Sequence, residues 1–267
     1  MRECNNAVLP GTRLPFYLGE AQAGWINPGL ARRCGDFPAF RVSADAVELT
    51  EPGALYDIAR TLSERGAFRF RGEVFDVRAR PDGPVLAQID RGAIPYFGIR
   101  ATGVHLNGLV QRADGLHMWI ARRAKDKLLD PGKLDHIVAG GIPAGHSPME
   151  TLIKEAAEEA AIPPELARQA VPVACFGYAA ERQEGLRRDW IYAYDVILPA
   201  DFTPRPVDGE VEAFELWPVR RAFAAVRDTG DFKFNVNLVL IDLFIRQGLI
   251  AGAEAESLRA GLASSPM

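Results

Sequence analysis

The pattern of apolar and polar positions in the first hundred residues changes every few positions. Residues 1–50 are rich in proline and glycine and carry no sustained repeat, so we expect loops anchored by isolated aromatic side chains. Apolar residues at helical spacing predict a helix over 52–65. Alternating residues on both sides of a Pro-Asp-Gly turn at 81–83 predict a hairpin within 68–90. We therefore expect a small α+β accessory domain over residues 1–102.

From residue 104 onward, longer strands and helices alternate, and we expect residues 103–267 to form a second domain. The last clear helix carries an i, i+3, i+4, i+7 apolar stripe typical of a helix with one buried face. The tail over 251–267 is small and polar, and predicts a short peripheral helix. The other predicted elements are a hairpin about an Asp-Gly turn at 114–115, strands over 171–179, 190–198 and 208–217, and helices over 149–161, 164–170, 218–228 and 236–247.

Composition is that of an ordinary globular protein, with 48% hydrophobic and 25% charged residues. The net charge of −4 argues against a broad nucleic-acid-binding or membrane-binding surface. No apolar run approaches the roughly 20 residues that span a bilayer, and the first residues lack the apolar core of a signal peptide. Cys4, Cys34 and Cys175 show no CxxC spacing and predict free thiols in a reducing compartment. We expect a cytoplasmic enzyme.

The stretch over residues 140–162 combines a glycine- and proline-rich loop with a helix whose carboxylates cluster. Glu155, Glu158 and Glu159 fall within a sector of about 100° of that helix. Like charges at this spacing cost perhaps a few tenths of a kcal/mol per pair on an isolated helix. A divalent cation reverses that repulsion, because carboxylate oxygens are the ligands that Mg²⁺ and Mn²⁺ prefer. The sequence therefore predicts a Mg²⁺ or Mn²⁺ site.

The spacing of residues 140–162 resembles the signature of the Nudix hydrolases, G-x5-E-x7-R-E-U-x-E-E-x-G-U, where U is a bulky aliphatic residue. All three glutamates of the helix are present at the expected positions. Four positions depart from the signature: His146 replaces Glu, Lys154 replaces Arg, Ala156 replaces the aliphatic residue and Ala161 replaces Gly. The resemblance implies a Nudix α/β/α sandwich, an α+β fold with a mixed sheet between helices, and hydrolysis of a pyrophosphate linkage.

The resemblance also implies roles for individual residues. Glu155, Glu158 and Glu159 would bind the metal. The proton of the attacking water would pass to Glu155 or to a carboxylate of the strand over 208–217, either Glu210 or Glu212. Ordinary solvated positions on a strand edge are the alternative interpretation of these last two residues. The assigned catalytic residues are Glu155, Glu158 and Glu212.

The loop that shapes this site is assigned to Gly140, Gly141, Gly145 and His146. His146 stands where the signature has its first glutamate, which is usually a supporting residue in the family. We expect His146 to stabilise the loop by hydrogen bonding. The alternatives are an altered set of metal ligands and reduced activity.

Basic residues precede the loop and are candidates for binding a diphosphate. We assign this role to Arg122, Arg123 and Lys133, since guanidinium groups suit bidentate phosphate contacts. The alternative is a solvated strand end. The aromatic residues on the predicted strands either stack on a substrate ring or belong to the core: Phe176, Tyr178, Trp190 and Tyr192. Scattered histidines show no zinc-binding spacing: His105, His117 and His136.

A narrower resemblance covers most of the chain. Segments 97–110, 118–145, 208–217 and 232–248 resemble the thiamine pyrophosphokinase-related Nudix hydrolases, in which lysine at position 154 and alanine at position 161 look customary. This resemblance implies hydrolysis of thiamine diphosphate or its oxidised analogues to the monophosphate and phosphate. A nucleoside diphosphate derivative as substrate, or a module that senses a phosphorylated metabolite without turnover, are the alternatives. We expect a small-molecule partner, no nucleic acid or membrane, and a possible homodimer.

Overall fold

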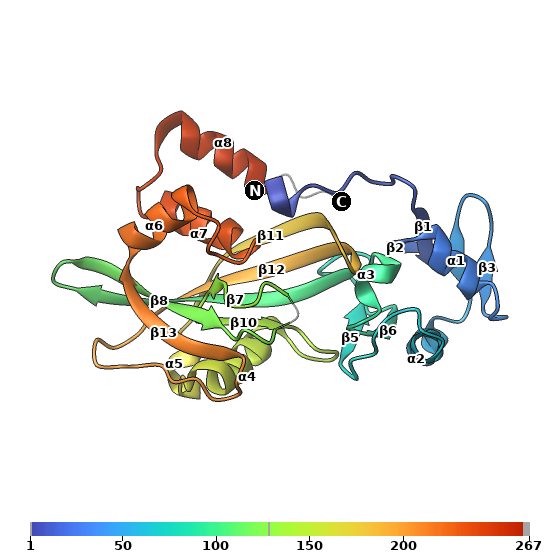
Figure 1. Cartoon of the computed structure of the whole chain (residues 1–267), viewed down its shortest axis with the longest axis horizontal. Helices are drawn as coiled ribbons and strands as arrows, with labels where there is room; N and C mark the ends of the chain where they lie inside the picture. Colours follow the sequence, from blue (N-terminus) through green and yellow to red (C-terminus); the bar gives the residue numbers. More distant parts are fainter. Residues whose placement is uncertain (1, 128, 264–267) are drawn as a thin grey trace.

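The computed structural model describes residues 2–127 and 129–263 and consists of a small N-terminal part beside a larger sandwich (Figure 1). The N-terminal part contains a four-stranded sheet in the order β2-β1-β4-β3, a separate two-stranded β5-β6 ladder and helices around them. Its elements are η1 (Arg2–Cys4), β1 (Leu14–Leu18), β2 (Ala21–Ile26), α1 (Pro28–Cys34), β3 (Phe40–Val42), β4 (Val47–Leu49), η2 (Pro52–Ala54), α2 (Leu55–Glu64), β5 (Val74–Val77), β6 (Ala87–Asp90) and α3 (Ile94–Phe97).

The expectation of loops over residues 1–50 is wrong, because this stretch forms all four strands of the four-stranded sheet. Its strands are only three to six residues long, too short to show a clear alternation in sequence. They are held by a shared core in which Phe16 and Phe40 lie 6.2 Å apart between ring centroids. The aromatic anchors were therefore expected correctly, but they join strands instead of loops.

The predicted hairpin within 68–90 is present as β5 and β6, although its first strand begins only at Val74. The residues before it are held differently. The carboxylate of Asp90 accepts hydrogen bonds from the backbone N–H groups of Arg71 and Gly72, at 3.0 and 2.7 Å. These backbone groups are thus satisfied by a side chain, and the strand ladder does not extend to them.

The larger part is an α/β/α sandwich, which confirms the expected fold class. Its mixed sheet has the order β11-β12-β7-β8-β13, with β10 added to β7 and β9 to β8. Helices α4 and α5 cover one face, and α6 and α7 cover the other (Figure 1). The elements are β7 (Arg100–Arg112), β8 (Gly115–Arg123), β9 (Leu134–Asp135), β10 (Val138–Gly141), α4 (Pro148–Ala160), α5 (Pro164–Ala167), β11 (Val171–Arg182), β12 (Gly185–Ile197), β13 (Val211–Pro218), α6 (Val219–Asp228), α7 (Val236–Arg246) and α8 (Gly252–Ala263).

The central strands β7 and β8 separate, and this separation makes room for the glutamate helix. They pair with each other only next to their shared turn, over Leu109–Arg112 and Gly115–Met118. Beyond that point β10 pairs with β7 and β9 pairs with β8. The chain leaving β10 then forms the glycine-rich loop and enters α4. Within the described ranges, no helix is both long and apolar enough to cross a membrane.

Candidate active site

The glutamate helix α4 begins and ends with well-defined caps. The Ser147 side chain accepts a hydrogen bond from the Glu150 N–H, and the Glu150 carboxylate accepts one from the Ser147 N–H, which together form a capping box. At the other end Ala161 adopts a left-handed conformation with φ of 53°. Glycine, the signature residue, adopts this conformation without steric cost. The caps fix where α4 starts and therefore which side chains face β10.

Glu155 lies against the first glycine of the loop. A Cβ atom at Gly140 would be 2.5 Å from Cγ of Glu155, so only glycine leaves room for this side chain. Burial raises the pKa of Glu155, and the neighbouring Lys154 ammonium, 3.4 Å from the carboxylate, opposes that rise. The loop glycine and the glutamate are therefore fitted to each other.

Glu159, one turn further along α4, is the most buried carboxylate of the helix, with 6% of its surface exposed. It accepts a hydrogen bond of 2.9 Å from the Ala139 N–H of β10. No ion pair of Glu159 is present among the described residues, and burial raises its pKa well above the usual value for glutamate. A buried carboxylate with one backbone donor and no ion pair is costly unless a cation is bound there.

Two acidic residues ahead of β13 meet Glu159. Carboxylate oxygens of Glu159, Asp208 and Glu210 all lie within 4.8 Å of one another. Burial opposes the ionisation of Glu210, but its ion pair with the Lys127 ammonium outweighs burial and lowers its pKa. Glu159 and Glu210 also line one small cavity between β10 and β13. The carboxylates of two distant segments therefore converge at the open end of the sheet.

The other predicted carboxylates lie at the margin of this group. Glu158 is exposed to solvent and pairs with the Lys154 ammonium. The exposed Glu212 accepts a hydrogen bond of 3.3 Å from the Lys125 N–H and is not part of the converging group. Asp208 had not been singled out from the sequence. Asp208 is the first residue of the predicted strand over 208–217, and nothing but its charge distinguishes it there.

Comparison with known proteins identifies the family. The model of the NUDIX domain matches residues 103–236, and a domain of unknown function, DUF4743, matches residues 1–101. The chain is 36% identical over 260 residues to the chloroplastic Nudix hydrolase 24 of Arabidopsis thaliana, and the match covers 92% of this chain and 71% of that protein. The chain belongs to the Nudix hydrolase family. The α4 helix and the loop before it are accordingly its Nudix helix and Nudix loop.

Two further similarities accompany this match. The chloroplastic Nudix hydrolase 20 of Arabidopsis thaliana is 40% identical over 198 residues, which are 74% of this chain and 53% of that protein. The crystal structure of DR0079 from Deinococcus radiodurans aligns with a TM-score of 0.47 and 21% identity, over 70% of this chain and 98% of that one.

The family match makes the chain a Nudix pyrophosphohydrolase, and enzymes of this family generally use divalent metal ions.

The donor set of the site suits such an ion. Hard divalent cations prefer carboxylate oxygens, and the converging group offers three carboxylates. Two lysine ammonium groups, those of Lys127 and Lys154, contact Glu210, Glu155 and Glu158. Glu159 and Asp208 have no cationic partner among the described residues, and Glu159 is buried. The residues present therefore fit a divalent metal ion.

The three cations expected to bind a diphosphate are placed in different surroundings. Arg123 is 12% exposed, and its guanidinium donates to the Asp135 carboxylate at 2.9 Å and to the carbonyl oxygens of Leu129 and Asp130. Arg122 remains partly exposed, 3.5 Å from Glu215. Lys133 donates to the Gly230 carbonyl oxygen. Arg123 lines the same small cavity as Glu159 and Glu210, whereas Arg122 and Lys133 do not line it. The role of all three in binding stays a prediction.

The remaining loop residues support the shape of the turn. Gly145 has φ of +77°, a conformation that suits glycine. A Cβ at Gly141 would lie 2.8 Å from the ring of Phe75, so this glycine allows close packing against β5. His146 is exposed, with Nδ1 3.2 Å from the Ala144 carbonyl oxygen. That contact lies within the loop, in accordance with a supporting role for His146.

A buried histidine pair beside the site was not expected from the sequence. Nδ1 of His105 lies 2.8 Å from Nδ1 of His136, and burial lowers the pKa of His136 to about 4, so both rings are neutral at neutral pH. Asp135 completes the cluster, but its carboxylate is already held by Arg123 and by Lys233 at 3.2 Å. Because two cations occupy this carboxylate, the cluster supports the sheet opening and is not a second metal site.

The aromatic candidates divide between the two faces of the sheet. Phe176 and Tyr178 are buried in a core with α7, as the core interpretation held. Trp190 and Tyr192 lie on the opposite face and are half-buried. They therefore stay candidates for contact with a ring.

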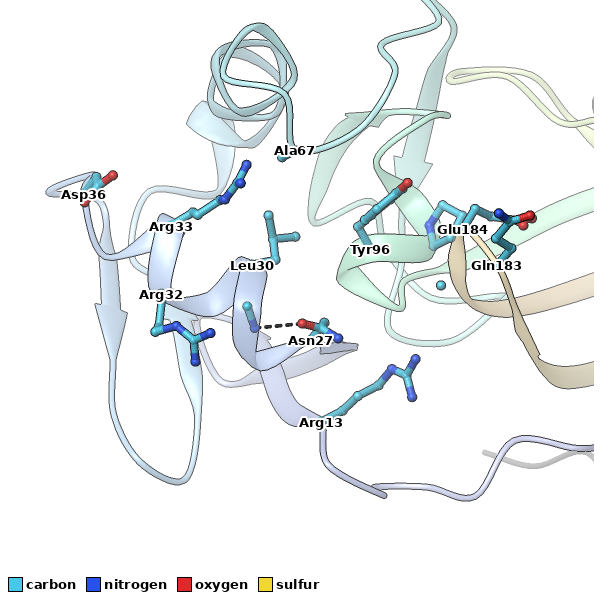
Figure 2. Close-up of a pocket in the computed structure, with 13 residues that line it drawn as sticks. Arg13, Asn27, Leu30, Arg32, Arg33, Asp36, Ala67, Tyr96, Gln183 and Glu184 are labelled. Atoms are coloured by element: carbon cyan, nitrogen blue, oxygen red, sulfur yellow. Dashed lines mark hydrogen bonds between the residues drawn. The ribbon is translucent and has the colours of Figure 1, made fainter.

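A separate cavity of about 640 Å³ lies between α1 and the β11–β12 turn (Figure 2). Arg13, Arg33 and Tyr96 are among its lining residues, and the Arg13 guanidinium pairs with Glu181 next to the turn. None of the converging carboxylates lines it. This cavity is not the catalytic centre.

Proposed function

We propose that this Nudix enzyme cleaves the diphosphate of thiamine diphosphate, or of an oxidised analogue, to give the monophosphate and phosphate. The convergence of Glu159, Asp208 and Glu210 beside the Nudix loop supports metal-assisted attack of water on a diphosphate. The choice of substrate is supported by the resemblance of the chain to the thiamine pyrophosphokinase-related hydrolases. The half-buried rings of Trp190 and Tyr192 suit a ligand with a heteroaromatic group.

Mg²⁺ or Mn²⁺ would be held by the converging carboxylates of Glu159, Asp208 and Glu210, with Glu155 against the Nudix loop and Glu158 at the margin. When bound, the ion neutralises phosphate charge and favours ionisation of the attacking water. The chain keeps its glutamates in place through the Ala139 N–H on Glu159 and through the contact of Glu155 with Gly140. Glu210 takes the place of Glu212 in this proposal because Glu210, and not Glu212, lies in the converging group.

Proton transfer is assigned to Glu155. The oxygen of the water forms a bond to phosphorus, the bridging P–O bond breaks, and the water's proton passes to the carboxylate. Burial raises the pKa of Glu155, and this brings its pKa closer to that of an effective general base near neutral pH. Glu212 is the alternative acceptor from the same side of the sheet.

Lys127 is assigned a second role in binding. Its ammonium pairs with Glu210 in this structure. If the Glu210 carboxylate held a metal ion, the Lys127 ammonium would be free to contact a phosphate oxygen, as would the partly exposed Arg122 and the neighbouring Lys125.

We also propose that the chain divides into a domain over 1–102 and a Nudix domain over 103–267, and that the enzyme works in the cytoplasm.

Product analysis for a panel of diphosphates, with and without Mg²⁺, tests this function: phosphate release is measured for thiamine diphosphates, and nucleoside monophosphate release for dinucleotides and sugar nucleotides. We expect metal-dependent turnover of thiamine diphosphate or its oxidised forms that exceeds turnover of dinucleotides and sugar nucleotides. Glu159→Gln should lower turnover at least ~10²-fold, whereas Glu64→Gln on the exposed side of α2 should leave it unchanged. Preference for dinucleotides would refute the thiamine assignment. Binding without any turnover in the wild-type chain would identify a sensing module instead.

A further inference from the structure

The N-terminal part of the chain reaches the Nudix loop directly. Strand β5 accepts a hydrogen bond of 2.8 Å from the Ala144 N–H to the Val74 carbonyl oxygen. The Asp76 carboxylate accepts a second bond, of 3.2 Å, from the Gly145 N–H. Between them, the Phe75 ring packs on Gly141. β5 therefore lies along the loop that shapes the metal site (Figure 1).

Two arginines are held beside this contact by one buried carboxylate. Asp90 is fully buried and accepts backbone N–H bonds from Arg71 at 3.0 Å and from Gly92 at 2.8 Å. The bond to Arg71 ties the segment before β5 to the end of β6, where Arg91 lies. The Arg91 guanidinium carbon is 5.9 Å from the centroid of the Phe75 ring, whose other neighbour is Gly141. The Phe75 ring thus lies between the Arg91 guanidinium and Gly141 of the Nudix loop.

The charge at this position is unbalanced. Arg91 pairs with Glu73 at 2.6 Å, and both side chains are well exposed. Arg71 has no ion pair or side-chain hydrogen bond among the described residues. Burial lowers the pKa of Arg71, and the neighbouring cations Arg91 and Arg187 lower it further. Arg71 is thus an exposed guanidinium without a carboxylate partner among the described residues, next to the accessible Arg91, and such a group favours an anionic ligand.

The same patch lies beside the loop that holds Glu155. The Phe75 ring packs on Gly141, and the Glu155 side chain lies against the adjacent Gly140. The Arg91 guanidinium lies over that Phe75 ring. One aromatic ring therefore separates an accessible guanidinium of the N-terminal part from the loop glycines that contact Glu155.

We propose that Arg71 and Arg91 are substrate-binding residues that hold phosphate oxygens of the diphosphate bound at the Nudix carboxylates. The active site is then composite, with metal-binding carboxylates from the Nudix part and phosphate-binding guanidinium groups from the N-terminal part. This inference rests on the proposed function for the identity of the anion as a diphosphate. It assigns a role in catalysis to the region before residue 102.

Calorimetric titration of the whole chain with methylenediphosphonate, a diphosphate that cannot be hydrolysed, in the presence of Mg²⁺ tests the proposal. Arg91→Gln and Arg71→Gln should each weaken binding about 10-fold, the scale of one charge-assisted hydrogen bond. In turnover assays both variants should raise KM more than they lower kcat. Arg41→Gln, on the exposed strand β3, is the matched control and should change neither quantity.

Glu73→Gln separates ligand binding from a structural ion pair. If Arg91 serves only to hold Glu73, this substitution weakens binding as much as Arg91→Gln, and the proposal fails. If Arg91 binds the diphosphate, releasing it from Glu73 leaves binding unchanged or tighter. Unchanged binding in both arginine variants also overturns the proposal. Because the titration needs no turnover, loss of the hydrolytic function and loss of this inference give different results.

Discussion

The side chain of Glu155 occupies the space that a side chain at Gly140 would fill. A Cβ at position 140 would lie 2.5 Å from Cγ and 2.6 Å from Cδ of the glutamate. Real Cβ atoms do not approach other atoms so closely, so any larger residue must displace the carboxylate. The first glycine of the loop therefore acts on catalysis through the position of one glutamate.

Gly140→Ala should lower kcat by about 10-fold to 100-fold, because a displacement of about 1 Å of a catalytic group has effects of this size. The melting temperature should fall only slightly, since Glu155 can rotate away. Steady-state kinetics and thermal unfolding measure the two effects. Gly53→Ala is the control, because a Cβ there meets nothing within 4 Å. Unchanged kcat in Gly140→Ala would contradict the assigned position of Glu155.

The buried Glu159 predicts a pH-dependent stability of the metal-free protein. Its pKa is raised in the folded state by burial, so the folded state holds the proton more tightly than the unfolded state. As pH rises above the ordinary value of 4.5, the free energy of unfolding falls through the contribution of this group. Glu159→Gln removes that contribution and should be more stable than wild type at neutral pH, with the difference shrinking toward pH 4.5.

Chemical denaturation of both proteins in EDTA, at several pH values, checks this difference. Mg²⁺ provides the second measurement. At a concentration 100 times its dissociation constant, a ligand of the folded state stabilises it by about 2.7 kcal/mol. Wild type should gain stability with Mg²⁺, and Glu159→Gln should gain much less. An equal gain in both proteins would exclude Glu159 as a metal ligand.

Glu210 and Glu212 offer a matched pair of substitutions on one segment. Glu210→Gln should lower metal affinity or turnover about 10-fold to 100-fold, as expected for a group that supports a metal ion. Glu212→Gln should change turnover less than about 3-fold, because this carboxylate is exposed and accepts one backbone hydrogen bond. The Mg²⁺ dependence of turnover in both variants measures the effect. The reverse order of effects would return the catalytic role to Glu212.

His146 carries the least usual feature of the Nudix loop. The residue is exposed and its ring contacts only the loop carbonyl of Ala144 among the described residues. His146→Glu restores the signature residue and should leave turnover within roughly 10-fold of wild type. Turnover at saturating Mg²⁺ measures this. A much larger gain would show that the wild-type metal site lacks a ligand at this position.

Local sequence patterns predicted those elements whose apolar repeat runs along their whole length. The Nudix helix was predicted over 149–161 and found over Pro148–Ala160, and the last long helix was predicted over 236–247 and found over Val236–Arg246. Both carry several turns of a 3.6-residue pattern. The hairpin at the Asp-Gly signal is present, but its two turn residues are Ala113 and Asp114, and Gly115 is the first residue of β8.

Features that depend on distant pairing were missed. The short strands of residues 14–49 are held by contacts with each other and contain too few residues to show a period. His105 and His136 meet because β10 pairs with β7, a register that neither segment specifies alone. Asp208 joins Glu159 for the same kind of reason. Local sequence therefore indicates the chemistry of the Nudix helix, while its partners depend on the whole sheet.

The bond from the Ala144 N–H to the Val74 carbonyl joins the shape of the catalytic loop to a strand about 70 positions earlier in the chain. Substitutions that alter the packing of β5 would therefore displace the loop at a smaller loss of stability than is needed to unfold the protein. Such variants would accumulate to normal protein levels but have low turnover. An activity assay alone would not distinguish them from active-site variants. Assays that record protein level and turnover together would recognise them.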